Sequence, residues 1–391
     1  MKSKPIYLDY SATTPVDPAV VEAMGPYFTG FFGNASSVHA HGRKAKAALE
    51  RSREIIATEL GVLPGEIFFT SGGTESNNTA LTGAAQAMRK NGKSHIITSK
   101  AEHHAVLETC EYLETIGFSV TYLDVNRYGG VEPDTLEWAF REDTGLVSLM
   151  HANNELGTLH DIGLFGDLCR HRGILFHSDA VQTFTKIPMQ THSFPVDLLS
   201  VSAHKIYGPK GIGALYVRNG VEIERILHGG GQERGRRGGT ENVPLAVGFA
   251  EAVKGMQQGG EQERMRIRML RDKMIEGLKE SCHGIHMNTD PDNSIESILN
   301  ISFDDTIMSV DGEALLMSLD GAGLCVSNGS ACTSGSLEPS HVQLAIGHTP
   351  ATARSAIRFS FGRYTTEEEI GLAVDIVVKV IAKIGRPAEN V

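Results

Sequence analysis

Short apolar segments alternate with longer amphipathic segments over the first two-thirds of this 391-residue chain. Seven of the apolar segments have the length and composition of buried strands: 66–70, 95–99, 119–124, 146–151, 174–178, 197–202 and 213–217. Helical patterns lie between them, at 37–60, 74–89, 104–116, 162–172 and 242–256. This alternation predicts an α/β fold with a mainly parallel seven-stranded sheet flanked by helices.

The helical pattern breaks at a glycine-rich stretch, 255–260, and a highly charged helical segment follows at 261–279. Beyond it, strand and helix patterns are fewer: 297–303, 312–319, 356–361 and 366–384. This composition is typical of a smaller α+β domain. We therefore expect a large domain over 15–257 and a small domain that combines 1–14 with 258–391.

The net charge of −11 argues against general binding to nucleic acids or membrane surfaces. No apolar stretch is long enough to span a bilayer, and the first residues lack the apolar core of a secretory signal. The five cysteines are scattered without a CxxC pair, which excludes a disulfide framework and a cysteine-rich zinc site. We therefore expect a cytoplasmic protein with no stable metal site, no nucleic-acid partner and no membrane partner.

Lys205 follows an apolar, strand-like run. Such a lysine either extends to water with its stem on apolar surface or has a chemical use. Desolvation lowers the pKa of an amine, and a neutral amine can form a Schiff base with an aldehyde. Ser202 and His204 offer groups suited to a phosphate beside it. Lys205 is therefore a candidate anchor for an aldehyde cofactor that carries a phosphate.

Other polar residues follow neighbouring strand patterns, where open parallel sheets bind their ligands. Gly73 and Thr74 lie in a turn before a helix, which is either a phosphate cradle or a tight connection. Asp179 is either a partner for a pyridinium nitrogen or a cap of the next turn. His103 is suited to stacking on a cofactor ring and to proton transfer. Asn154 offers an amide to a ring oxygen or a substrate carboxylate, or builds an Asx turn.

Three features lie outside these strand ends. The stretch 229–240 is rich in glycine and arginine and suits an anionic ligand, including one held by a neighbouring subunit. Cys332 lies among small and polar residues, which indicates a nucleophile rather than an inert buried thiol. Arg358 lies in a strand pattern and suits either a bidentate contact with a carboxylate or a structural ion pair.

Together these motifs resemble those of the cysteine desulfurases of the NifS/IscS type, in the class V aminotransferase family. Seven segments carry the resemblance, in the family's order: 8–15, 70–78, 153–157, 202–205, 229–240, 329–334 and 355–360. The resemblance implies pyridoxal 5′-phosphate as cofactor and the fold of type I pyridoxal-phosphate transferases. It also implies a long, mobile loop, about 325–338, that carries the cysteine nucleophile.

The resemblance assigns a role to each matching residue of the cofactor site. It makes Lys205 the covalent anchor of the cofactor, and Asp179 the partner of the pyridinium nitrogen. Gln182 would bond the ring hydroxyl, and His103 would stack on the ring as a catalytic acid and base. Four residues would hold the phosphate: Gly73, Thr74, Ser202 and His204. Thr240 would reach the phosphate of the partner subunit, which implies a homodimer.

On the substrate side, Asn154 and Arg358 would grip the carboxylate of L-cysteine, helped by Asn34. Cys332 would take the sulfur as a persulfide while L-alanine is released. The sulfur would pass to an acceptor protein for iron–sulfur cluster assembly or other thio-cofactor synthesis, and Cys332 could transiently ligate a cluster with a scaffold. The alternatives are a selenocysteine lyase, another class V aminotransferase, and a non-catalytic sulfur carrier that kept the fold.

Overall fold

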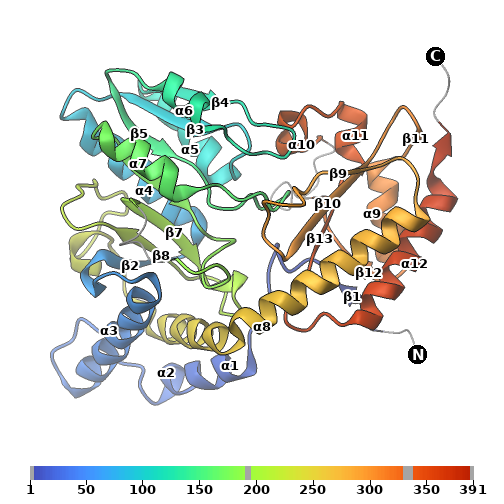
Figure 1. The fold of residues 1–391 in the computed structure, drawn as a ribbon. Coiled ribbons are helices and arrows are strands. Elements are labelled where there is room, and N and C mark those ends of the chain that lie inside the picture. The colour runs from blue at the N-terminus through green and yellow to red at the C-terminus, as the bar shows by residue number, and fades with distance from the viewer. Residues whose placement is uncertain (1–3, 190–194, 329–337, 388–391) are drawn as a thin grey trace.

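The computed structural model describes residues 4–189, 195–328 and 338–387. The predicted nucleophile Cys332, and most of the loop predicted around it, therefore lie outside the described residues. Figure 1 shows two unequal parts, with the larger one on the left and the smaller one on the right.

The larger part is built on a seven-stranded sheet with helices on both faces (Figure 1). Its strands, in spatial order, are β2 (Ile67–Thr70), β8 (Gly213–Val217), β7 (Leu198–Ser202), β6 (Leu175–Asp179), β5 (Thr144–Ser148), β3 (His95–Ser99) and β4 (Ser119–Leu123). Only β8 among them runs antiparallel to its neighbours. The predicted fold class is confirmed, although β5 begins two residues earlier than its pattern suggested.

Alternate residues of each strand face opposite layers of helices. Phe68 of β2 packs in one core with Ala80 and Val106, whereas Phe69 packs in another with Ile56. The first core uses α4 (Gly73–Arg89) and α5 (His104–Thr115). The second uses α3 (Ala40–Leu60), α6 (Pro133–Ala139), α7 (Ile162–His171) and α1 (Pro18–Met24), beside which lies α2 (Pro26–Thr29). Burial on both faces explains why the strands read as continuous apolar runs.

The smaller part has its own antiparallel sheet and core. The sheet order is β13 (Ile357–Ser360), β10 (Ile298–Phe303) and β9 (Ile285–Met287), and two short pairs join β1 (Ile6–Tyr7) to β12 (Leu324–Cys325) and β11 (Met308–Ser309) to β14 (Arg386–Pro387). Its helices are α9 (Gly312–Gly321), α10 (His341–Ala345), α11 (Pro350–Arg354) and α12 (Glu367–Ile384). The N-terminal residues Ile6 and Leu8 belong to this core.

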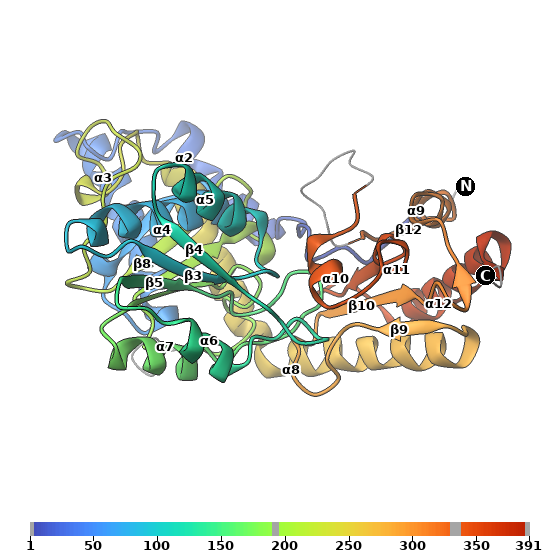
Figure 2. The same cartoon turned by 90° about the horizontal axis from the view of Figure 1, so that it is seen from above.

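Helix α8 (Val243–Ser281) runs through both parts (Figures 1 and 2). The sequence predicted that the helix would break over 255–260, and this was wrong for most of these residues. Only Gly260 leaves the helical conformation, with φ 47° and ψ −142°. A glycine inside a helix costs only about 1 kcal/mol. Packing of α8 against α1, α3 and α12 offsets this cost, so the helix continues across the glycines.

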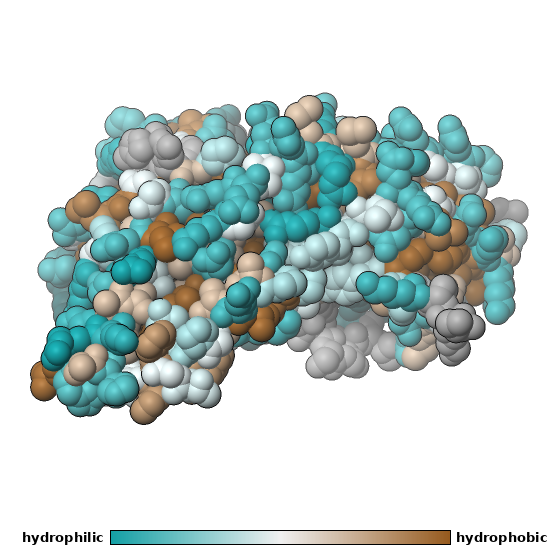
Figure 3. Space-filling view, turned by 90° about the horizontal axis from the view of Figure 1, so that it is seen from below, coloured by the Kyte–Doolittle hydropathy of each residue, from teal (hydrophilic) through white to brown (hydrophobic). Residues whose placement is uncertain are grey.

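The face seen from below is mainly hydrophilic, with apolar side chains interspersed (Figure 3). Within the ranges given above, no helix combines the length and apolar character needed to cross a membrane.

Candidate active site

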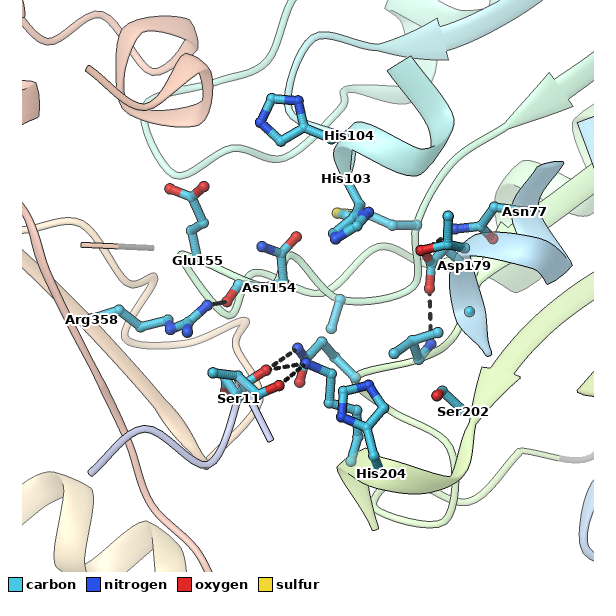
Figure 4. Close-up of a pocket in the computed structure, with 18 of the residues that line it drawn as sticks. Ser11, Asn77, His103, His104, Asn154, Glu155, Asp179, Ser202, His204 and Arg358 are labelled. Atoms are coloured by element: carbon cyan, nitrogen blue, oxygen red, sulfur yellow. Dashed lines mark hydrogen bonds between the residues drawn. The ribbon is translucent and has the colours of Figure 1, made fainter. Parts of the chain in front are cut away.

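A cavity of about 300 Å³ lies where the carboxyl ends of β2, β7, β6, β5 and β3 face the smaller part (Figure 4). Ten of the thirteen predicted site residues line it: Gly73, Thr74, His103, Asn154, Asp179, Gln182, Ser202, His204, Lys205 and Arg358. The rule that ligands bind beyond the carboxyl ends of parallel strands therefore located the cavity correctly. Asn34 and Thr240 do not line it, and Cys332 is not described.

Lys205 ends the short 3-10 helix Ala203–Lys205 that directly follows β7. Its Nζ atom donates hydrogen bonds to the main-chain oxygens of Ser11 and Ala12, the latter at 2.8 Å. The amine therefore lies inside the cavity and does not extend to water. The residue after next, Tyr207, has a positive φ of 64°, which is rare outside glycine and holds a sharp turn behind the lysine.

The predicted phosphate cradle is formed by the N-terminus of α4 and the end of β7. The residue before α4, Gly72, has φ 155° and no side-chain cap, so the first N–H groups of the helix are left for another acceptor. The buried Ser202 Oγ has no hydrogen-bond partner in the described part of the chain. Burial and the positive charge of Lys205 lower the pKa of His204 to about 3, so its ring is neutral. An anion at this position would satisfy these donors.

Asp179 is the last residue of β6 and is 7% exposed. Its Oδ1 atom accepts from the Val181 amide at 2.9 Å, and its Oδ2 atom accepts from Asn77 Nδ2 at 2.6 Å. The turn-capping interpretation is thus correct, yet the carboxylate also lines the cavity. Both donors are neutral, so they leave the negative charge for a cationic ligand. Gln182, on the same turn, has a buried Oε1 without a described partner.

His103 lies over the cavity as the N-cap of α5 (Figure 4). Its Nδ1 atom accepts from the Ala105 amide at 3.0 Å, so in the neutral ring the proton is on Nε2. Burial lowers the pKa of His103, and Asp179 partly opposes this effect. The ring is therefore neutral near pH 7 and carries an Nε2–H donor.

Arg358 enters the cavity from β13 on the opposite side (Figure 4). Its Nη2 atom lies 2.8 Å from Asp9 Oδ1, and its Nη1 atom donates to the main-chain oxygen of Asn154 at 2.8 Å. The structural ion pair considered for this arginine is therefore present. Arg358 Nε and Asn154 Oδ1 are buried and have no partner among the described residues.

Two buried carboxyl groups were missed from the sequence: Glu155, which lines the cavity, and Glu102, which directly precedes the lining residue His103. Glu102 accepts from the Met150 amide at 2.9 Å, and burial raises its pKa to about 8. Glu155 accepts from Ser340 Oγ at 2.6 Å, and burial raises its pKa to about 7. Both acidic residues stand among the residues that follow apolar strand runs, and that position was the available signal.

The glycine-rich stretch 229–240 packs away from the cavity, against α3 and α4. Glu233 forms a buried ion pair with Arg53, at 2.6 Å, and also accepts from the Phe69 amide. Arg237 pairs with Glu75 in the first turn of α4 at 2.7 Å. These pairs hold the stretch on the surface of the larger part and leave Thr240 exposed.

In the segments that the structure covers, no group of three or more His, Cys, Asp or Glu side chains could hold a metal ion.

Comparison with known proteins gives matches along nearly the whole chain. The family model described as aminotransferase class-V matches residues 6–372. A curated relative from Salmonella schwarzengrund (strain CVM19633), named cysteine desulfurase IscS, is 51% identical over 385 residues, which cover 97% of this chain and 93% of the relative.

Two solved structures are also similar. One, called NifS-like protein, has a TM-score of 0.90 and 40% identity and covers 97% of this chain and 100% of its own. The other, described as SspA in complex with cysteine, has a TM-score of 0.80 and 39% identity and covers 92% and 99%.

Proposed function

Because the chain belongs to the class V aminotransferase family, we propose that it is a cysteine desulfurase that uses pyridoxal 5′-phosphate. The supporting observation is that one cavity brings together an amine, Lys205, an uncapped helix N-terminus beside Ser202, and a carboxylate, Asp179. These groups match the aldehyde, the phosphate and the ring nitrogen of that cofactor. The relatives' names supply the substrate, L-cysteine.

The polar atoms without partners fit this cofactor. Ser202 Oγ and the first amides of α4 would hold its phosphate, with Gly73, Thr74 and His204 around it. Gln182 would bond the ring hydroxyl, and Asp179 the ring nitrogen. When bound, the cofactor supplies an electron sink for the bonds around the amino acid's α-carbon.

The protein's own groups bind the substrate and move its protons. Arg358 and Asn154, from opposite domains, would orient the carboxylate of L-cysteine. Lys205 and His103 would carry protons to and from the substrate carbons. The sulfur would pass to Cys332, where an S–S bond forms as the substrate C–S bond breaks, and a proton completes the methyl group of alanine.

The direct test measures L-alanine and sulfide formed from L-cysteine in the presence of a thiol reductant. Cys332→Ala should abolish both products. Cys325→Ala, at another free cysteine, is the matched control and should retain them. Equal activity in the two variants would exclude Cys332 as the acceptor. Comparing alanine formation from L-cysteine and from L-selenocysteine in Cys332→Ala separates a desulfurase from a selenocysteine lyase, because the latter needs no cysteine nucleophile.

We further propose a homodimer, with Thr240 of one subunit reaching the cofactor of its partner. Thr240 is exposed and lies outside the cavity of its own chain. Close to Asn34 in the sequence, several large apolar residues are exposed to solvent. The exposed fraction is 59% for Phe28, 67% for Phe32 and 89% for Val38. A second subunit would bury this surface. Light scattering should report a dimer, and Phe32→Glu should dissociate it.

The same proposal includes a cofactor-binding domain, 15–257, and a small domain formed by 1–14 and 258–391. The pairing of β1 with β12 and the packing of Ile6 and Leu8 in the second core support this division. For the sulfur acceptor we propose an iron–sulfur scaffold protein. Transfer of labelled sulfur from L-[³⁵S]cysteine to a purified scaffold tests this, and Cys332→Ala should prevent the transfer.

A further inference from the structure

Helix α10 of the smaller part is joined to the larger part by two consecutive residues. Ser340, its N-cap, accepts from the Val342 amide at 3.1 Å and donates its own proton to Glu155 Oε2 at 2.6 Å. The next residue, His341, places Nε2 at 2.8 Å from the main-chain oxygen of Glu102. These contacts position the His341 ring in the wall of the active-site cavity.

The contact with Glu102 determines where the proton of His341 lies. A carbonyl oxygen can only accept a hydrogen bond, so Nε2 must carry the proton. The neutral ring therefore has a lone pair on Nδ1, and no described residue donates a hydrogen bond to that atom. Burial lowers the pKa of His341, which keeps this lone pair available at neutral pH. The ring also contacts His104 edge-on, with centroids 4.6 Å apart.

We propose that His341 is a second base of the active site, whose Nδ1 atom takes the proton of a thiol that enters the cavity. This rests on the proposed function, because a desulfurase must convert a thiol to a thiolate before sulfur is transferred. The S–H bond breaks, an Nδ1–H bond forms and the electron pair stays on sulfur, so nothing is oxidised. His341 then releases this proton to solvent. One proton is taken up when the methyl group of alanine forms, so the reaction neither gains nor loses protons overall.

The neighbouring titratable groups are less suited to this task. His103 already uses Nδ1 as an acceptor, and the Nδ1 atom of His104 lies 3.7 Å from Oε1 of Glu108. Glu155 is bonded to Ser340. The other ionisable groups of the cavity have the roles proposed above: Asp179, His204, Lys205 and Arg358. His341 therefore combines a fixed tautomer with an unused nitrogen at the cavity wall.

His341→Gln tests the proposal, since glutamine can still donate to the Glu102 oxygen but is not a base. At neutral pH, sulfide formation should fall about 100-fold, as expected for loss of a general base. The deficit should shrink as the pH rises, because hydroxide then ionises the thiol. His286→Gln, at a histidine outside the cavity, is the control and should leave the rate unchanged. A wild-type pH profile for His341→Gln would overturn the proposal.

Two further measurements distinguish the two thiols. In the enzyme without L-cysteine, iodoacetamide labelling of Cys332, followed by mass spectrometry, should move to higher pH in His341→Gln if the protein thiol is the proton donor. In a Cys332→Ala background, His341→Gln should slow the absorbance change on mixing with L-cysteine if the substrate thiol is the donor. No effect in either measurement would contradict the proposal.

Added imidazole distinguishes the loss of a base from a folding defect. It should partly restore the activity of His341→Ala if a base is missing, and no restoration in a variant with wild-type circular dichroism would contradict the proposal. A wild-type enzyme that formed no alanine from L-cysteine would instead contradict the proposed desulfurase function.

Discussion

The two walls of the cavity differ in what their polar groups contact. On the side of the seven-stranded sheet, the buried Ser202 Oγ and Gln182 Oε1 have no described partner. On the side of the smaller part, Arg358 donates to the main-chain oxygen of Asn154 and His341 to that of Glu102, and both of these oxygens belong to the larger part. The first wall is therefore built to receive a ligand, whereas the second also holds the two parts together. Substitutions on the first should affect binding, and substitutions on the second should also affect stability.

The largest effect is expected at Lys205. Lys205→Ala removes the proposed covalent anchor of the cofactor, so alanine formation should fall at least about a thousandfold. The visible absorbance of the purified protein should also be lost. Lys210→Ala, at an exposed lysine five residues further on, is the matched control and should change neither property. A coloured, active Lys205→Ala protein would remove the basis of the cofactor assignment.

Arg358 should show the double role of the second wall. Arg358→Ala leaves the Asp9 carboxylate and the Asn154 oxygen without their partner, so unfolding should become easier by about 3 kcal/mol. Arg268→Ala breaks a pair with Asp272 on the surface and should cost less than about 1 kcal/mol. Urea unfolding of the cofactor-free variants measures both. Equal losses would mean that the Arg358 pair contributes no more than a surface contact.

Glu155, which contacts Ser340 of the second wall, should make the stability of the protein sensitive to pH. Its pKa is about 7 in the folded protein and 4.5 in the reference state, so between these values the folded state binds more protons. Stability should therefore fall by about 3 kcal/mol as the pH rises from 4.5 to 7. Glu155→Gln should remove this part of the pH dependence, which urea unfolding at several pH values can measure. An unchanged pH dependence in the variant would show that Glu155 ionises normally.

The smallest effect is expected at Ser202. Its hydroxyl has no described partner, so Ser202→Ala should change the stability of the cofactor-free protein by less than about 0.5 kcal/mol. Affinity for pyridoxal 5′-phosphate should fall about tenfold through the lost hydrogen bond. Ser200→Ala in the same strand breaks a contact with His177 and should cost about 1 kcal/mol of stability. Similar stability losses in the two variants would show that the Ser202 hydroxyl already has a partner in the cofactor-free protein.

The sheet and the cavity could be predicted because their signals are local. Each central strand is a continuous apolar run, and Lys205 and Asp179 stand directly at the ends of such runs. Contacts between distant segments left no such signal. The pair of Arg53 with Glu233 joins residues 180 positions apart, and Glu155 contacts Ser340 across 185 positions. No pattern in either segment specifies its partner.

The error at 255–260 has a different physical origin. Local propensity correctly marks these glycines as unfavourable in a helix, but tertiary packing on both sides of them decides the outcome. Only Gly260, with its positive φ, keeps the conformation that the local pattern suggested.

Helix α8 also has a thermodynamic consequence. Phe249 and Val253 from its first half are buried in one core, and Met274 and Leu278 from its second half in the other. If one core unfolded alone, its half of α8 would expose apolar side chains while the other half stayed ordered in the remaining core. This makes separate unfolding of either core unfavourable. The two parts should therefore melt as one cooperative unit, with a single calorimetric transition whose van't Hoff enthalpy equals its measured enthalpy.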